Sequence, residues 1–162
     1  MTETANASRT TDRELEITRV FDAPRELVFT AWTDPGQLAR WWGPHGFSAP
    51  SVALDVTPGG AWRTCMRNDA DGGELWASGV YREVVAPERL VFSYAWDTAD
   101  GAPGHETLVT VTFDDLGDKT RMTFRQAVFQ SVQERDEHRG GWSQCFDELA
   151  AYLSAVRATA GQ

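Results

Sequence analysis

The sequence predicts an α+β protein: a curved antiparallel sheet of about six to seven strands wraps around one long C-terminal helix, and two short helices follow the first strand. Three observations predict this fold. Residues 131–157 carry an apolar stripe at helical spacing. Residues 51–127 alternate between apolar and polar positions in segments separated by short turns. Residues 22–42 contain proline and glycine at positions that begin and end helices.

The C-terminal helix has one apolar and one polar side. At about 100° per residue, the apolar side holds Trp142, Cys145, Phe146, Leu149, Tyr152, Leu153 and Val156. Ser131 and Glu134 have the spacing of a capping box, which predicts that the helix begins there. Traced backwards, the apolar side continues to His138 and Arg135, so the stripe becomes polar and can face a ligand at this end.

The first strand is expected at residues 14–21, with Leu15, Ile17 and Phe21 on one face. Arg19 shares that face, and we expect its long side chain to reach solvent. The later strands are expected at residues 51–56, 61–67, 74–85, 89–96, 105–113 and 119–127. The two faces of 74–85 cannot be ranked, and a bulge would resolve them. Short turns between neighbouring strands favour an antiparallel meander.

A helix is expected after Pro24, with its buried side formed by Leu27, Val28, Ala31 and Trp32. A second short helix is expected at residues 37–42. The loop that follows, residues 41–50, holds two tryptophans and a phenylalanine, so we expect it to pack inward or to gate a cavity. His45 in this loop is expected to be exposed.

Two glycines stand together inside the C-terminal helix, Gly140 and Gly141. Each costs roughly 1 kcal/mol relative to alanine. They therefore predict either a close approach of the helix backbone to the sheet or a kink at the mouth of a pocket.

Length and composition predict one domain at residues 14–158, with loose tails at 1–13 and 159–162. The net charge of −9 argues against nucleic acid and anionic membranes as partners. No apolar run is long enough to span a membrane, and the two cysteines form no CxxC pair, so a reducing cytoplasm is the expected location. The three histidines do not have the spacing of a metal site, and no cofactor-binding motif is present.

Several motifs together resemble one family. They are Asp22-Ala23-Pro24-Arg25-Glu26-Leu27-Val28-Phe29, Trp41-Trp42-Gly43-Pro44 with Gly46-Phe47, Pro58-Gly59-Gly60-Ala61-Trp62, Pro87-Glu88-Arg89-Leu90-Val91-Phe92, and His138 with Gly141-Trp142 and Leu149. This set is similar to the bacterial homologues of the heat shock protein 90 ATPase activator, in the START and birch-pollen-allergen-like superfamily. The resemblance spans residues 14–157 and implies the helix-grip fold. It does not imply one activity, because the superfamily includes ligand binders, cyclases and chaperone partners.

Aromatic residues are abundant, with seven tryptophans and eight phenylalanines, and polar groups interrupt their rows. This mixture is typical of a small-molecule pocket. The expected ligand-binding residues lie on inward-facing strand positions and on the helix stripe: Trp62, Thr64, Phe92, Tyr94, Trp96, Thr107, Val109, Met122, Phe124, His138, Trp142 and Phe146.

The leading hypothesis is a protein that binds a small apolar or aromatic molecule between sheet and helix, without chemistry of its own and without a cofactor. One alternative is a cyclase-, dehydratase- or hydrolase-like enzyme in the same cavity, with His138 or His105 as acid or base. Another is a chaperone-binding module that acts through its outer surface, and a homodimer also stays open.

Other polar groups on inward positions that could serve such an enzyme are Arg135, Gln126 and Glu83. Cys65 lies between Arg63 and Arg67 on its strand, and these two charges could lower the pKa of its thiol.

Overall fold

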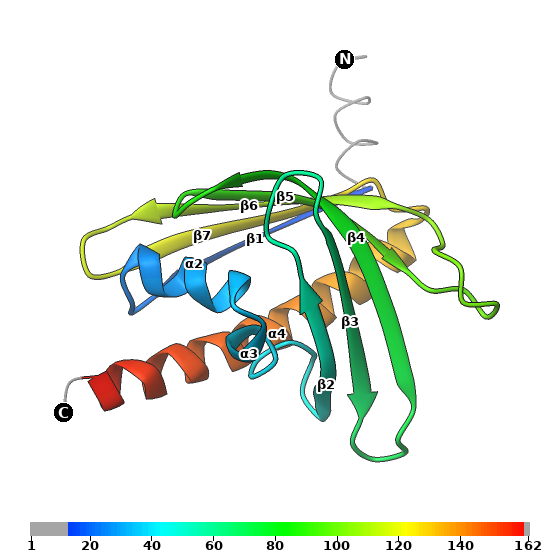
Figure 1. Ribbon diagram of the computed structural model, residues 1–162, viewed down its shortest axis with the longest axis horizontal. Helices are drawn as coiled ribbons and strands as arrows, with labels where there is room; N and C mark the ends of the chain where they lie inside the picture. The colour runs from blue at the N-terminus through cyan, green and yellow to red at the C-terminus, as the bar shows by residue number, and fades with distance from the viewer. Residues whose placement is uncertain (1–12, 161–162) are drawn as a thin grey trace.

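The structure is a computed structural model that describes residues 13–160. Its seven strands and three helices follow one another as β1 (Glu14–Phe21), α2 (Arg25–Thr33), α3 (Pro35–Leu38), β2 (Phe47–Leu54), β3 (Ala61–Asn68), β4 (Glu74–Val85), β5 (Arg89–Trp96), β6 (Thr107–Asp115), β7 (Thr120–Ala127) and α4 (Val132–Ala160). The strands form a single antiparallel sheet in the order β1-β7-β6-β5-β4-β3-β2. This is the predicted helix-grip fold (Figure 1).

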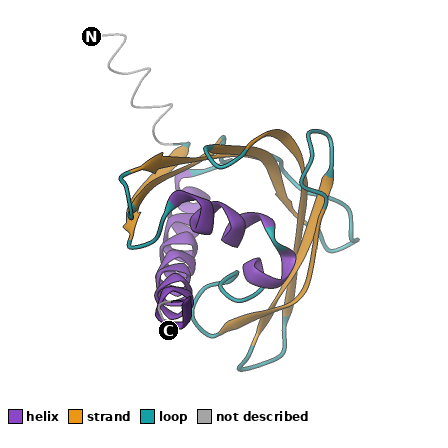
Figure 2. Cartoon of the chain, turned by 60° about the vertical axis from the view of Figure 1, so that its left-hand side comes forward, coloured by secondary structure: helices purple, strands orange, loops and turns teal. Residues whose placement is uncertain are grey.

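The sheet curls around the helices as an open half-barrel, and all three helices lie on its concave side (Figure 2). The apolar stripe of α4 packs into this concavity, as predicted: Trp142, Cys145, Phe146, Leu149 and Leu153 are buried. The Ser131 hydroxyl accepts a hydrogen bond from the Glu134 amide at 3.1 Å, which caps the first turn. The helix continues to Ala160, so it includes part of the segment 159–162 that was expected to be a tail.

Two arginines connect α4 to β1, which is an edge strand of the sheet. Arg19 does not simply reach solvent as expected, because its guanidinium pairs with Asp147 at 2.9 Å and donates to the Ser143 carbonyl at 3.0 Å. Arg139 donates in turn to the Glu16 carbonyl at 3.2 Å. These contacts fix the position of α4 along β1.

Three predicted boundaries were wrong. The second short helix begins at Pro35 instead of residue 37, because the Asp34 carboxylate caps it by accepting from the Gln37 amide at 3.0 Å. Strand β2 begins at Phe47, four residues before the expected start at 51. Strand β6 begins at Thr107, which leaves His105 in the preceding loop. The predicted tail at 1–13 lies outside the described residues except for Arg13.

A β-bulge resolves the two faces of β4. The pairing of β4 with β5 shifts register between Tyr81 and Glu83. Before the bulge Ala77 and Tyr81 are buried, and after it Val84 packs against the core. The extra residue explains why neither parity of this strand was uniformly apolar.

At Gly79 in β4, another residue passes close to the backbone. The Trp62 indole crosses this position and donates from Nε1 to the Ser93 carbonyl at 3.0 Å. A Cβ atom at Gly79 would overlap the Ser93 carbonyl oxygen and lie 2.5 Å from Trp62 Nε1. Because glycine has no Cβ atom, the Trp62 indole can pack against the backbone at this position.

We expect Gly79→Ala to lower the free energy of unfolding by about 2 kcal/mol or more, because the new methyl group must displace buried backbone and an indole ring. Urea denaturation measures the change. Gly140→Ala is the matched control: a Cβ there meets nothing within 4 Å, and the helix should gain about 1 kcal/mol. Equal stability of Gly79→Ala and the wild type would contradict the close approach.

Candidate functional site

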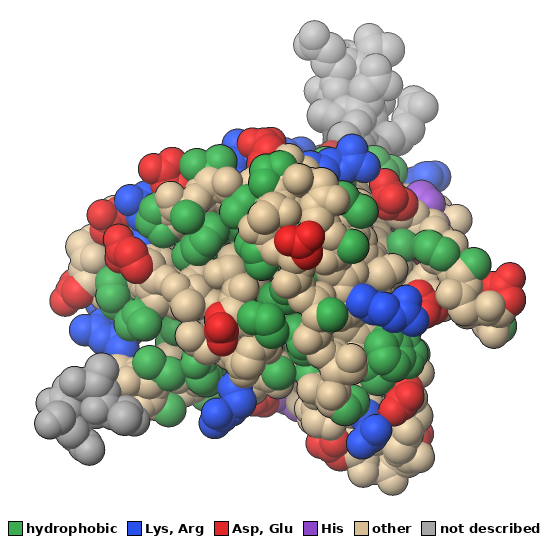
Figure 3. Space-filling view, viewed as in Figure 1, with side chains coloured by type: hydrophobic (Ala, Val, Ile, Leu, Met, Phe, Trp, Pro, Cys, Tyr) green, Lys and Arg blue, Asp and Glu red, His purple; other side chains and the backbone are tan. Residues whose placement is uncertain are grey.

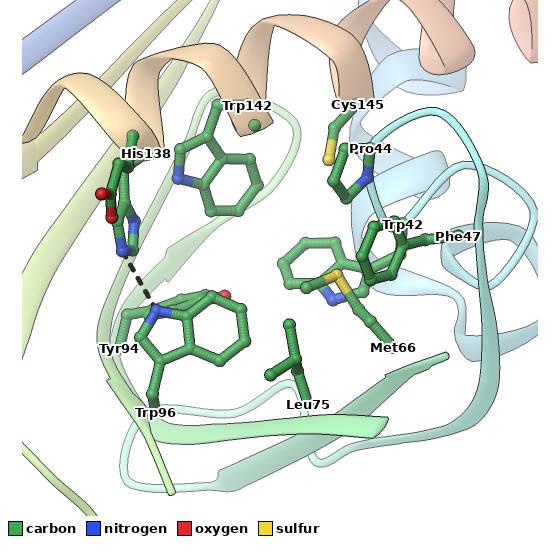
Figure 4. Close-up of a pocket in the computed structure, with 12 residues that line it drawn as sticks. Trp42, Pro44, Phe47, Met66, Leu75, Tyr94, Trp96, His138, Trp142 and Cys145 are labelled. Carbon is green, nitrogen blue, oxygen red and sulfur yellow. Dashed lines mark hydrogen bonds between the residues drawn. The ribbon is translucent and has the colours of Figure 1, made fainter. Parts of the chain in front are cut away.

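A cavity of about 270 Å³ lies between the N-terminal half of α4 and the sheet. Strand β5 contributes Tyr94 and Trp96, and α4 contributes Glu137, His138, Gly141, Trp142 and Cys145. The remaining wall comes from the α3–β2 loop and the strands β2 to β4, with Trp42, Pro44, Phe47, Met66 and Leu75. Figure 4 shows these side chains converging on one space from opposite sides. Most of the lining is apolar.

A hydrogen-bond network orders the wall of the cavity where α4 meets β5. Trp96 Nε1 donates to His138 Nε2 at 3.0 Å, the bond drawn in Figure 4. The other ring nitrogen, His138 Nδ1, lies 3.3 Å from Gln126 Oε1. Because Nε2 accepts from an indole, the proton of a neutral imidazole is on Nδ1 and can be donated to Gln126. Both ring nitrogens of His138 are therefore paired.

The network continues from Gln126 into the sheet. Gln126 Oε1 also accepts from Trp142 Nε1 at 2.8 Å, and Gln126 Nε2 donates to Thr107 Oγ1 at 2.8 Å. The Thr107 hydroxyl donates to the Tyr94 carbonyl at 3.0 Å. Gln126 and Thr107 are buried, so these bonds replace the water that both side chains lose on folding.

Burial shifts the pKa of several groups around the cavity. It lowers the pKa of His138 to about 4, against a smaller opposing effect of the Glu137 carboxylate. It raises the pKa of Tyr94 well above its ordinary value and the pKa of Cys145 to about 12. At neutral pH the imidazole, the phenol and the thiol are therefore all uncharged.

The twelve residues expected to bind a ligand fall into four groups. Tyr94, Trp96, His138 and Trp142 line the cavity. Trp62, Thr64 and Phe92 lie deeper, around a separate internal space of about 10 Å³, which is room for roughly one water molecule. Thr107 belongs to the hydrogen-bond network, and the other four are buried in the core: Val109, Met122, Phe124 and Phe146.

Eight cavity residues were not among those expected: Trp42, Pro44, Phe47, Met66, Leu75, Glu137, Gly141 and Cys145. Two sequence signals pointed to some of them. The aromatic loop 41–50 supplies Trp42, Pro44 and Phe47, and Trp42 is both buried and part of the cavity wall. The glycine pair supplies Gly141, although not through a close approach to the sheet, since a Cβ there meets nothing within 4 Å.

The other candidates for chemistry are engaged elsewhere. His105 Nε2 lies 2.6 Å from the Val128 carbonyl, and Arg135 pairs with Asp136 at 2.8 Å. Glu83 lies 3.6 Å from Arg89. The expected lowering of the Cys65 pKa is wrong: burial, aided by Glu74, raises it and outweighs the arginines at 67 and 63.

His45 is exposed, as expected, but it is not isolated. Its Nδ1 lies 2.8 Å from the Glu148 carboxylate, so the loop is joined to α4. Within residues 13–160 no group of three or more histidine, cysteine or acidic side chains could hold a metal ion. On the face seen in Figure 3, basic and acidic side chains are interspersed instead of gathered into one patch.

A curled antiparallel sheet around a long C-terminal helix, with a cavity between them, defines the class of helix-grip proteins. The family described as Activator of Hsp90 ATPase homolog 1-like protein matches residues 22–154. The chain belongs to this family. No curated protein is significantly similar to it in sequence. In the described part of the chain, no helix is both long and apolar enough to cross a membrane.

Solved structures support the same assignment. A crystal structure of a protein from Chromobacterium violaceum is 30% identical, with a TM-score of 0.79, and the match covers 87% of this chain and 96% of that one. The AHSA1 protein from Silicibacter pomeroyi is 28% identical, with a TM-score of 0.81 and coverage of 88% and 98%. A solution structure of a protein from Arthrobacter aurescens is 28% identical, with a TM-score of 0.79 and coverage of 90% and 88%.

Protonation of His138 is expected to destabilise the fold. Its pKa falls from 6.5 to about 4 on folding, so between these values the unfolded state binds more protons. The free energy of unfolding should therefore be highest above pH 6.5 and fall by on the order of 2–3 kcal/mol as the pH drops towards 4. Denaturant titrations across this range measure the loss.

His138→Gln is the control for that titration, because its side-chain oxygen can accept the Trp96 bond but gains no proton in this range. Every other ionisable group is the same in both proteins. The variant should lose less stability on acidification than the wild type. An identical pH dependence would contradict a buried, neutral His138.

Proposed function

We propose that this protein binds a small, apolar, ring-containing molecule in the cavity between α4 and the sheet, without chemistry of its own. The observation that supports this proposal is the composition of the walls: aromatic and aliphatic side chains surround the space, and the N–H groups of the indole rings are directed into hydrogen bonds with the protein. Rigid apolar walls with few polar groups are typical of small-molecule sites.

The size of the cavity limits the ligand. A dry protein cavity of about 150 Å³ accepts benzene. The cavity here, at about 270 Å³, is less than twice that volume, which suits one or two fused rings with a short substituent. Long acyl chains and sterol-sized molecules exceed it unless they extend through its opening.

The pairing of His138 favours binding over acid–base catalysis. A general base needs a free lone pair within hydrogen-bond reach of its substrate. The Nε2 lone pair of His138 accepts the Trp96 indole, and its Nδ1 faces Gln126. Cys145 is no better as a nucleophile, because a thiol with a pKa of about 12 forms almost no thiolate at neutral pH.

A chaperone-binding role is the alternative that the description of the family favours. Such a role would use the outer surface. A substitution that fills the cavity would therefore leave chaperone binding intact but would weaken small-molecule binding, and this difference distinguishes the two roles.

We expect Gly141→Leu to weaken the binding of a two-ring probe such as 1-acetonaphthone, measured by titration calorimetry. Gly141 borders the cavity, and a side chain added there enters open space, so it occupies ligand volume without displacing a packed residue. A loss of affinity of at least about tenfold is expected, corresponding to about 1.4 kcal/mol.

Gly140→Leu is the matched control, because the neighbouring glycine is exposed and does not line the cavity. Both variants should be at least as stable as the wild type, since leucine is the better helix former. If the probe bound Gly141→Leu as tightly as Gly140→Leu, the cavity would not be the binding site.

A further inference from the structure

The three tryptophans that line the cavity have no N–H group left for a ligand. Trp42 Nε1 donates to Thr64 Oγ1 at 3.1 Å. Trp96 Nε1 donates to His138 at 3.0 Å, and Trp142 Nε1 donates to Gln126 at 2.8 Å. A ligand that used any of these donors would have to break a bond within the protein. The indoles therefore offer their ring faces and edges alone.

The Tyr94 hydroxyl is different. Tyr94 is 3% exposed and lines the cavity, yet its hydroxyl makes no hydrogen bond to another residue of the described chain. Figure 4 shows this oxygen directed towards the middle of the surrounding side chains. Burial, with a smaller effect of Cys145, raises the pKa of Tyr94 well above its ordinary value, so the hydroxyl keeps its proton. The hydroxyl therefore borders the cavity as a donor without a protein partner, and an acceptor on a ligand can receive its hydrogen bond.

The charge of the lining restricts the ligand further. Glu137 is the one charged side chain among the described residues of the wall, and no lysine or arginine accompanies it. A carboxylate or phosphate entering the cavity would lose its hydration and gain no opposite charge. The cavity therefore favours an uncharged ligand.

We propose that the ligand is a neutral aromatic carbonyl compound of one or two rings, whose oxygen accepts a hydrogen bond from the Tyr94 hydroxyl. This inference rests on the proposed binding function and adds the chemical class of the ligand. Tyr94 is then the residue that distinguishes a ketone from a hydrocarbon of the same shape, while the indole walls bind the rings of both.

The test compares three probes by titration calorimetry: 1-acetonaphthone, the hydrocarbon 1-isopropenylnaphthalene, in which a CH2 group replaces the ketone oxygen, and the anion 1-naphthoate. The wild type should bind the ketone about three- to tenfold more tightly than the hydrocarbon, the range for one neutral hydrogen bond, and should bind the anion most weakly. Tyr94→Phe should bind ketone and hydrocarbon equally. Tyr152→Phe is the control: it removes a tyrosine hydroxyl from a part of α4 that does not line the cavity, so this variant should still bind the ketone more tightly than the hydrocarbon.

Tyr94→Phe should fold normally, because the missing hydroxyl has no partner within the described protein. Equal affinity of the wild type for ketone and hydrocarbon, or a ketone preference that survives in Tyr94→Phe, would overturn the inference and leave the binding function standing. Tightest binding of 1-naphthoate would overturn the neutral class. If none of the three probes bound, the proposed function itself would fail.

Discussion

The buried carboxamide of Gln126 is the group on which the geometry of the cavity depends. Its oxygen accepts from Trp142 and faces His138, and its nitrogen donates to Thr107. Through these partners one side chain of β7 is connected to β6 and to α4. Leaving such a buried amide unpaired would cost about 1–3 kcal/mol for each lost partner. The network therefore favours one position of α4 over the sheet, and that position leaves the cavity open.

The same bonds determine the chemistry of the space. Each indole that borders it has its polar edge engaged by the protein, so the cavity receives the apolar surface of the ring. His138 is held neutral by burial and by two partners that suit a single tautomer. Gly141 provides room where any other residue of the helix would project a side chain. An aromatic wall is thus combined with the Tyr94 hydroxyl, which has no hydrogen-bond partner among the described residues.

Much of the fold could be predicted from the sequence because periodicity reports which side of an element faces inward. The stripe around Trp142 and the row Phe92, Tyr94 and Trp96 were identified in this way, and all are on the concave side. Periodicity does not report depth. Phe92 lies in the core, whereas Tyr94 and Trp96, on the same strand, reach the cavity. The depth of a residue depends on where the helix crosses the curled sheet. That crossing point is determined by contacts between residues that are far apart in the sequence.

The hydrogen bonds across the cavity wall could not be predicted from the sequence either. Trp96 and His138 are 42 positions apart, and no local pattern indicates that an indole of β5 meets an imidazole of α4. Indole proton exchange measured by NMR tests this network most directly. At neutral pH the Nε1 protons of Trp96 and Trp142 should exchange far more slowly than that of Trp76, whose indole nitrogen donates no hydrogen bond within the described chain. Exchange of all three at one rate would contradict the account.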